Sequence, residues 1–161
     1  CVKFPDKWEF VNNIMENVHA VDTTLFRKDG KWWLFTNIKE NEGSSNWDEL
    51  FLFYSLELLS KSWKAHPANP IVSDASSARP AGNIFLFNDN IYRPSQNCSN
   101  GYGYGIKINQ IIALNEYDYQ ELCINSIEPE WDKKITGLHT LNFYGHLTII
   151  DAKMKRRKPL W

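Results

Sequence analysis

A repeat of about 56 residues runs along the chain and constrains its fold more than any other feature of the sequence. The turn residues Gly30, Asp89 and Gly145 stand 59 and 56 positions apart. An independent aromatic marker recurs after 55 and then 56 positions, at Trp8, Trp63 and Tyr119. Two unrelated landmarks therefore share one period, and a period of some tens of residues is typical of propellers and solenoids.

Each repeat unit has the sequence pattern of β structure. Apolar and polar residues alternate in segments rich in aromatic and β-branched side chains, and no long stretch keeps a period of 3.6. Every unit is expected to open with a hairpin whose turn contains Gly, Asn or Asp. The predicted hairpins cover residues 24–35, 84–92 and 140–150. A third strand is expected over 49–56 and 105–114, followed by a fourth that carries the aromatic marker.

Four antiparallel strands make one blade of a β-propeller, so the sequence predicts an all-β chain of about three blades. The chain is expected to open on the fourth strand of a missing blade, at residues 7–9, and to form a single partial domain over 1–161. The polar stretch 41–46 falls between two strands of one blade and is interpreted as a loop. Open strand edges should be covered by the remaining blades or by another chain.

Composition excludes several classes of partner. Lys and Arg number 18 against 19 Asp and Glu, so net charge gives no bias toward nucleic acid or an anionic membrane. No apolar run approaches the roughly 18 residues that span a bilayer. The chain is therefore expected to be soluble, in a compartment that the sequence does not indicate. Cys1, Cys98 and Cys123 are too scattered for a metal site or a disulfide framework, and free buried thiols are predicted. No cofactor is expected.

The segment from Val21 to Phe35 resembles the blade signature of five-bladed propellers that include arabinanases, β-xylosidases and arabinofuranosidases. The resemblance implies that Asp22 faces a central funnel and tunes the pKa of a catalytic acid, and that His139 in Gly137-Leu138-His139 lies at the funnel centre. Where that family carries its general acid, the sequence around Arg79 has no carboxylate. The family's catalytic base would lie two blades before Asp22, outside this chain.

Several short motifs are more similar to the propeller domain of glucosamine inositolphosphorylceramide transferases. They are Ala78–Gly82, Tyr92–Ser99, Gly137–Leu141 and Ile150–Lys153, and they occur in the same order as in that family. This resemblance implies a segment of a larger glycan-modifying protein, in a five-bladed ring.

The candidate site follows from the repeat, because Asp22, Arg79 and His139 stand 57 and 60 positions apart and should face one axis. Arg79 and Arg93 offer planar multi-donor groups suited to carboxylate, phosphate or vicinal hydroxyls. Two alternatives stay open: Arg79 and Asp22 neutralise each other, and His139 is an ordinary interior histidine. The full set of predicted ligand-binding residues is His19, Asp22, Arg79, Arg93, Gln96, Asn97, His139, Asp151 and Lys153, with no metal ligand among them.

These residues favour a propeller domain that binds carbohydrate or a sugar phosphate. A glycosidase or glycosyl-transferring enzyme is the second hypothesis, and it needs a displaced carboxylate such as Asp74 or Asp151, or one outside the chain. A structural or protein-interaction propeller is the third. The repeat-position tryptophans are predicted to pack between blades rather than to bind sugar: Trp8, Trp32, Trp33 and Trp63.

Overall fold

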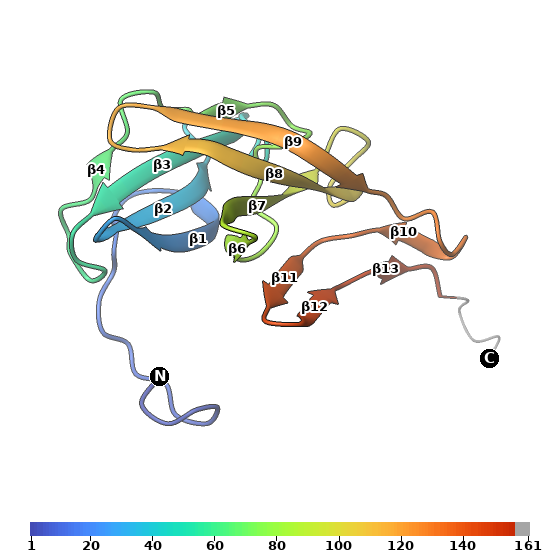
Figure 1. The fold of residues 1–161 in the computed structure, drawn as a ribbon, viewed down its shortest axis with the longest axis horizontal. Helices are drawn as coiled ribbons and strands as arrows, with labels where there is room; N and C mark the ends of the chain where they lie inside the picture. Colours follow the sequence, from blue (N-terminus) through green and yellow to red (C-terminus); the bar gives the residue numbers. More distant parts are fainter. Residues whose placement is uncertain (157–161) are drawn as a thin grey trace.

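A computed structural model describes residues 1–156 and shows an all-β architecture there (Figure 1). This described part of the chain holds thirteen strands, all antiparallel, and no helix, which confirms the all-β part of the predicted fold class. It therefore also offers no helix long and apolar enough to cross a membrane. Of the predicted domain 1–161, residues 157–161 lie outside the described residues.

The first repeat unit forms a sheet in which successive strands are neighbours. Its strands are β1 (Ala20–Lys28), β2 (Lys31–Ile38), β3 (Glu49–Ser55), β4 (Lys64–Ala65) and β5 (Val72–Ser73). The order is β1-β2-β3-β4, and β5 pairs with β3 at its other end. Asp29 and Gly30 make the β1–β2 turn with φ of 51° and 74°, the left-handed conformation that Asp and Gly tolerate. The predicted first hairpin is thus confirmed.

The second unit repeats this topology. Its strands are β6 (Phe85–Phe87), β7 (Asn90–Asn97), β8 (Gly105–Leu114) and β9 (Tyr119–Ile127), in the order β6-β7-β8-β9. The turn residues Asn88 and Asp89 again have positive φ, 47° and 61°. The predicted order of hairpin, third strand and fourth strand is confirmed in both units, and the marker Tyr119 lies on β9, whereas Trp63 directly precedes β4.

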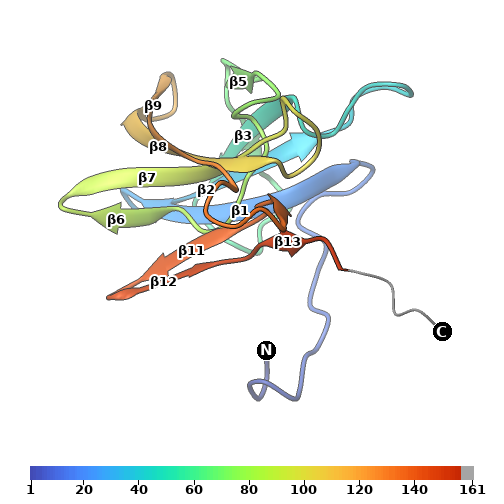
Figure 2. The same ribbon diagram turned by 90° about the vertical axis from the view of Figure 1, so that its right-hand side faces the viewer.

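The third unit is smaller and pairs with the second unit through backbone hydrogen bonds. It contains β10 (Ile135–Gly137), β11 (Leu141–Tyr144), β12 (Leu147–Ile150) and β13 (Lys153–Met154), with β11 against β12 and β10 against β13. The amide of Leu141 donates to the Ala81 carbonyl at 2.7 Å, and that of Leu138 donates to the Gly103 carbonyl at 2.9 Å. The hairpin accordingly lies beside the second sheet (Figure 2).

The predicted opening strand at residues 7–9 is wrong. Lys3 and Lys7 pair across a tight turn instead, and this N-terminal segment extends away from the sheets (Figure 1). Trp8, which should have packed between blades, is 67% exposed and donates only to the nearby Pro5 carbonyl. A strand needs a neighbouring strand for its backbone groups, and residues 1–156 offer none there.

Two apolar clusters join the units. The larger lies between the first two sheets and includes Trp33, Phe35, Leu52 and Ile111. The smaller lies between the second sheet and the third unit and is formed by Ala81, Ile106, Leu138 and Leu141. Trp33 therefore packs as predicted, while Trp32 and Trp63 are only half-buried.

All three cysteines are free thiols, as predicted. Their expected burial holds for Cys98 and is wrong for Cys1 and Cys123, which are exposed. The sheets of residues 1–156 do not close into a ring, so the propeller itself stays a prediction.

Candidate functional site

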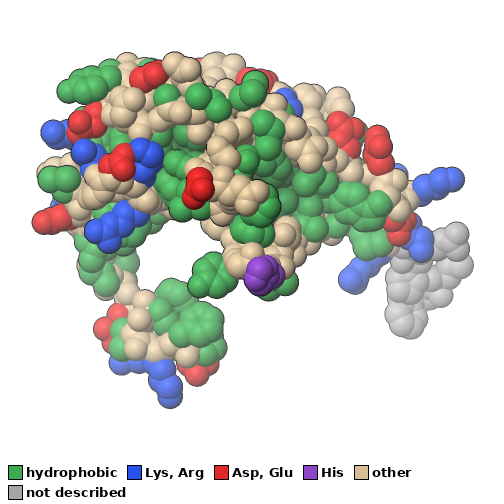
Figure 3. Space-filling model, in the orientation of Figure 1, with side chains coloured by type: hydrophobic (Ala, Val, Ile, Leu, Met, Phe, Trp, Pro, Cys, Tyr) green, Lys and Arg blue, Asp and Glu red, His purple; other side chains and the backbone are tan. Residues whose placement is uncertain are grey.

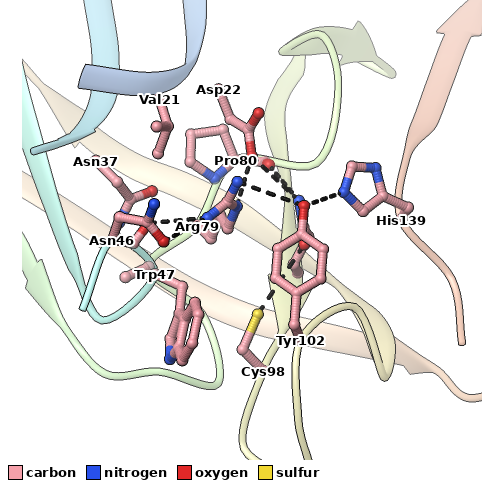
Figure 4. A network of polar contacts seen from close by, with 12 residues as sticks. Val21, Asp22, Asn37, Asn46, Trp47, Arg79, Pro80, Cys98, Tyr102 and His139 are labelled. Carbon is pink, nitrogen blue, oxygen red and sulfur yellow. Dashed lines mark hydrogen bonds and ion pairs between the residues drawn. The ribbon is translucent and has the colours of Figure 1, made fainter. Parts of the chain in front are cut away.

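A network of polar side chains lies where the first strands of the units begin (Figure 4). In an antiparallel sheet of consecutive strands, the start of the first strand and the loop between the second and third lie at the same end. Asp22 lies near the start of β1, and Asn46 lies in the β2–β3 loop. Arg79 precedes β6, Tyr102 lies in the β7–β8 loop, and His139 directly precedes β11. Topology alone therefore brings these side chains together.

Arg79 lies at the centre of the network, and its side chain is only 8% exposed. Its Nε donates to Asp22 Oδ2 at 2.5 Å. One terminal nitrogen donates to both the backbone carbonyl and the side-chain oxygen of Asn46, at 3.0 Å each. Most of the guanidinium's donor capacity is thus used within the protein, and its charge is paired with Asp22.

Asp22 adopts an unusual backbone conformation to reach this position. Its φ is 50°, and the register of β1 against β2 shifts between Val21 and Thr24, so a β-bulge turns the side chain away from the regular strand pattern. Backbone outliers of this kind cluster at functional sites. The Asp22 side chain is 33% exposed, and its Oδ2 also accepts from Gln96 Nε2 at 3.4 Å.

Tyr102 connects Arg79 to His139. The guanidinium carbon of Arg79 lies 4.8 Å from the centroid of the Tyr102 ring, within the range of a cation–π contact. The Tyr102 hydroxyl is hydrogen-bonded to His139 Nε2. Trp47 lies against the same tyrosine, with ring centroids 6.1 Å apart. The network therefore has an aromatic side, formed by Trp47 and Tyr102.

A groove of about 360 Å³ opens between the three units beside this network. More of its wall surface is apolar than polar, but the walls also carry hydroxyl, amide, imidazole and carboxylate groups. These groups supply the donor and acceptor chemistry that binds sugar hydroxyls. Its volume falls in the range of small-molecule sites. The lining residues are Asp22, Thr23, Thr24, Leu25, Pro80, Gly82, Asn83, Gln96, His139, Thr140 and Asn142.

Cys98 lies beneath this groove as a buried thiol. Its sulfur is 4.0 Å from Gln96 Oε1, and burial raises the pKa of the Cys98 thiol. A thiol with a raised pKa is a poor nucleophile, because only the thiolate reacts readily. Cys98 therefore contributes packing to the site and no covalent chemistry.

Arg93 does not join the other predicted site residues. It is 1% exposed, and it donates to both carboxylate oxygens of Glu121 at 2.8 and 2.6 Å and to the Ser77 carbonyl at 2.7 Å. Burial alone would lower the pKa of Arg93, but the carboxylate of Glu121 and the phenol of Tyr119 outweigh it and raise that pKa. Arg93 is a fully paired interior charge that binds the second sheet to the segment before β6.

The remaining predicted residues lie around the groove rather than on its walls. His19 is exposed just before β1, and Lys153 is exposed on β13. Asn97 accepts from the backbone and hydroxyl of Ser99, at 3.1 and 2.6 Å. Asp151 Oδ1 accepts the backbone amides of His139 and Thr140, at 2.9 and 2.6 Å, and so holds the His139 backbone in place.

Asp74, the other carboxylate considered for acid–base chemistry, lies outside the groove. Burial works to raise its pKa, but hydrogen bonds from Ser76 and Ser77 and the charge of Lys107 outweigh burial and lower it. An acid with a lowered pKa is ionised near neutrality and cannot donate a proton to a leaving group. It borders a separate hollow of about 600 Å³ together with Lys107, Tyr119 and Cys123.

Sequence reasoning missed three members of the network: Asn46, Trp47 and Tyr102. The signal was present, because Asn46 and Tyr102 stand 56 positions apart, one full repeat, in equivalent loops of two sheets. Both segments have the polar or glycine-rich composition of turns. The repeat pattern alone does not show that these loops lie at the same end of the sheets as the other site residues, because that depends on the order of the strands.

The structure is thus that of an all-β protein built from repeated units. A groove of small-ligand size lies at the end that the sheets share. The family model "Glucosamine inositolphosphorylceramide transferase 1, N-terminal" matches residues 1–150, and the chain belongs to this family. The resemblance to that family noted in the sequence is thereby confirmed.

Curated relatives bear the same name. Glucosamine inositolphosphorylceramide transferase 1 of Oryza sativa subsp. japonica is 36% identical over 127 residues, which cover 78% of this chain and 17% of the relative. The protein of that name from Arabidopsis thaliana is 32% identical over 124 residues, or 76% of this chain and 16% of the relative. The chain thus spans about a sixth of the length of these relatives. No solved structure matches.

Proposed function

We propose that this chain is part of a five-bladed β-propeller that binds carbohydrate in the groove beside Asp22 and His139, within a larger glycan-modifying protein. One observation carries the proposal: Asp22 and His139, from equivalent positions of the first and third units, line one groove of small-ligand size. The name of the relatives, glucosamine inositolphosphorylceramide transferase, contains a sugar and so supports a sugar-related role.

The groove walls suit sugar hydroxyls, each of which donates one hydrogen bond and accepts others. Gln96 and Asn142 carry amides, Thr23 and Thr140 carry hydroxyls, and His139 adds a ring nitrogen. Trp47 and Tyr102 are 36% and 48% exposed, so part of each side chain is accessible to a sugar that extends beyond the groove. Such mixed polar and aromatic surfaces orient a ligand by directional contacts and stacking.

Binding is favoured over hydrolysis by the carboxylate content of the groove. Glycosidases use two carboxyl groups on either side of the scissile bond. Asp22 is the single carboxylate among the described residues that line the groove, and it is engaged by Arg79. Its role as a pKa modulator for a catalytic acid belongs to the enzyme alternative, in which the other carboxylates come from outside this chain.

Titration of the 161-residue chain with uncharged mono- and oligosaccharides tests the proposal, with binding followed by NMR or calorimetry. Replacing His139 with Ala removes a ring that lines the groove and contacts Tyr102. Loss of one directional hydrogen bond predicts binding weaker by about fivefold or more. His146→Ala, in the exposed turn of the third hairpin, is the matched control and should bind normally. Equal affinities of the two variants would contradict the site.

A further inference from the structure

The groove contains no cationic side chain. Of its lining residues, Asp22 alone carries a full charge when His139 is neutral, and neither Lys nor Arg is among them. An anionic ligand in this groove would therefore meet a carboxylate and no opposing positive charge on the walls.

Arg79 does not supply that missing positive charge. It lies behind Asp22, with its Nε bound to that carboxylate and one terminal nitrogen bound twice to Asn46. The Tyr102 ring covers the guanidinium, and Arg79 is absent from the groove walls. The other terminal nitrogen donates to the Tyr102 hydroxyl at 3.4 Å, so a phosphate or carboxylate would have to displace Asp22 or Tyr102 to reach the guanidinium. Arg79 is thus a positioning residue that holds Asp22.

One carboxylate oxygen of Asp22, Oδ1, accepts no side-chain hydrogen bond from the described residues. Both described side-chain hydrogen bonds to Asp22, from Arg79 and Gln96, end on Oδ2. The other carboxylate oxygen points away from Arg79 (Figure 4), on a side chain that is one-third exposed. A carboxylate oxygen accepts a hydrogen bond from a sugar hydroxyl and repels another anion.

From this geometry, and resting on the proposed carbohydrate-binding function, we infer that the groove selects uncharged sugars and rejects sugar phosphates and uronates. Asp22 is the residue that imposes this selection. The inference narrows the ligand class that the two arginines had suggested from sequence, where a sugar phosphate was equally expected.

Matched probes test the selection: glucose with glucuronate, galactose with galacturonate, and glucose 6-phosphate, each titrated into the 161-residue chain at low salt. Arg79 offsets part of the charge of the partly exposed Asp22 carboxylate, so we expect each anionic probe to bind more weakly than its neutral partner by about fivefold or more. Added salt should narrow the gap, because it screens a partly exposed charge.

Asp22→Asn removes the negative charge, while the amide oxygen can still accept from Arg79, whose positive charge is then unpaired. Both changes favour anions, so the gap between neutral and anionic probes should shrink to about twofold or less. Asp29→Asn is the matched control, since Asp29 has the same left-handed φ (51°) at the opposite end of β1, and its gap should not change.

The outcomes separate the two proposals. Tight binding of an anionic probe with weak binding of its neutral partner would overturn the charge selection and leave carbohydrate binding intact. An unchanged gap in a folded Asp22→Asn variant would also overturn it. If that variant fails to fold, a salt-independent gap in the parent chain would overturn it. Absence of binding by every probe, neutral or anionic, would overturn the proposed function together with this inference.

Discussion

Arg79 is the residue whose replacement should disturb both the fold and the groove. Arg79→Ala leaves the Asp22 carboxylate without its ion-pair partner and the Asn46 oxygens without their donor. Because Asp22 is partly exposed, water compensates some of this loss, and we expect a decrease in unfolding free energy of about 1–3 kcal/mol. Ligand affinity should also fall, since Asp22 loses its orientation. Urea denaturation and sugar titration measure the two effects.

The control for this prediction is Lys61→Ala, which removes a surface ion pair with Glu16 whose side chains are 71% and 59% exposed. Exposed pairs contribute about 0–1 kcal/mol, so stability and binding should stay close to those of the parent chain. Equal stability losses in the two variants would show that the Arg79–Asp22 pair contributes no more than a surface contact.

Ionisation of Tyr119 should lower the unfolding free energy of the chain at high pH. Burial raises the pKa of its phenol well above the ordinary value of 10.0, and the hydroxyl donates to Glu121 at 2.5 Å. A raised folded-state pKa means that the folded chain holds this proton more tightly than the unfolded chain. The corresponding stability is complete below about pH 10 and is lost as the pH rises through the folded-state pKa.

Tyr119→Phe should therefore flatten the fall in unfolding free energy above about pH 10, measured by urea denaturation at several pH values. The slope that remains belongs to other groups with raised pKa values, including Cys98 and Tyr104. Tyr117→Phe, at an 82% exposed position, should leave the slope unchanged. If Tyr119→Phe kept the parent chain's slope of unfolding free energy against pH, ionisation of Tyr119 would not be the cause of the loss of stability at high pH.

For single residues, the sequence predicted which side chains lie together better than it predicted what each one contacts. The repeat spacing placed Asp22, Arg79 and His139 at one end of the molecule, because equivalent positions of equivalent sheets share an end. It could not distinguish Arg79, beside the groove, from Arg93, which pairs with Glu121 in the interior. That difference depends on the direction in which each side chain points. The partner of Arg93, Glu121, lies on another strand, 28 positions away in the sequence.

At the scale of elements, the third unit is held to the second by glycines that permit backbone contact. A Cβ at Gly137 would lie 2.2 Å from the Gly103 carbonyl oxygen, closer than any real contact. Gly137→Ala should push β10 and the following His139 away from the β7–β8 loop. We expect a loss of about 1–3 kcal/mol and weaker sugar binding, measured by thermal unfolding and titration.

Gly145→Asn is the control for Gly137→Ala. Gly145 makes the tip of the third hairpin with φ of 60°, and a Cβ at this position would meet no atom within 4 Å. Asn tolerates this left-handed conformation, so stability should change by no more than about 0.5 kcal/mol. A Gly137→Ala chain as stable as the Gly145→Asn chain would contradict the proposed backbone contact.

The three hairpins were predictable because their turns carry Asp-Gly, Asn-Asp and Tyr-Gly between apolar strands, a local signal that needs no tertiary context. The strand expected at Trp8 was predicted wrongly, because the repeat marker gives the position of an aromatic residue and does not show whether a partner strand is present. Its counterpart at Trp63 flanks the two-residue strand β4, whereas Tyr119 opens the nine-residue strand β9. In this chain a strand forms where a neighbouring strand is available to pair with, rather than wherever the aromatic marker occurs.

At the scale of the whole molecule, the third unit presents apolar surface and an open strand edge. Tyr144, Leu147 and Ile149 are 89%, 60% and 59% exposed, and within residues 1–156 strand β12 pairs with β11 alone. Figure 3 shows apolar side chains on the face of the molecule that it draws. Exposed apolar edges pair readily with other chains, so the 161-residue chain should self-associate at high concentration.

Ile149→Lys places a charge on this edge and should shift the chain toward monomer, as observed by sedimentation velocity over a range of concentrations. Ile112→Lys is the matched control: Ile112 is 58% exposed, but its strand β8 already has neighbours on both sides. If both variants reduce association equally, general surface hydrophobicity is responsible and the edge has no special role. If only Ile149→Lys acts, β12 is the edge along which a further strand pairs, as continuation of a blade requires.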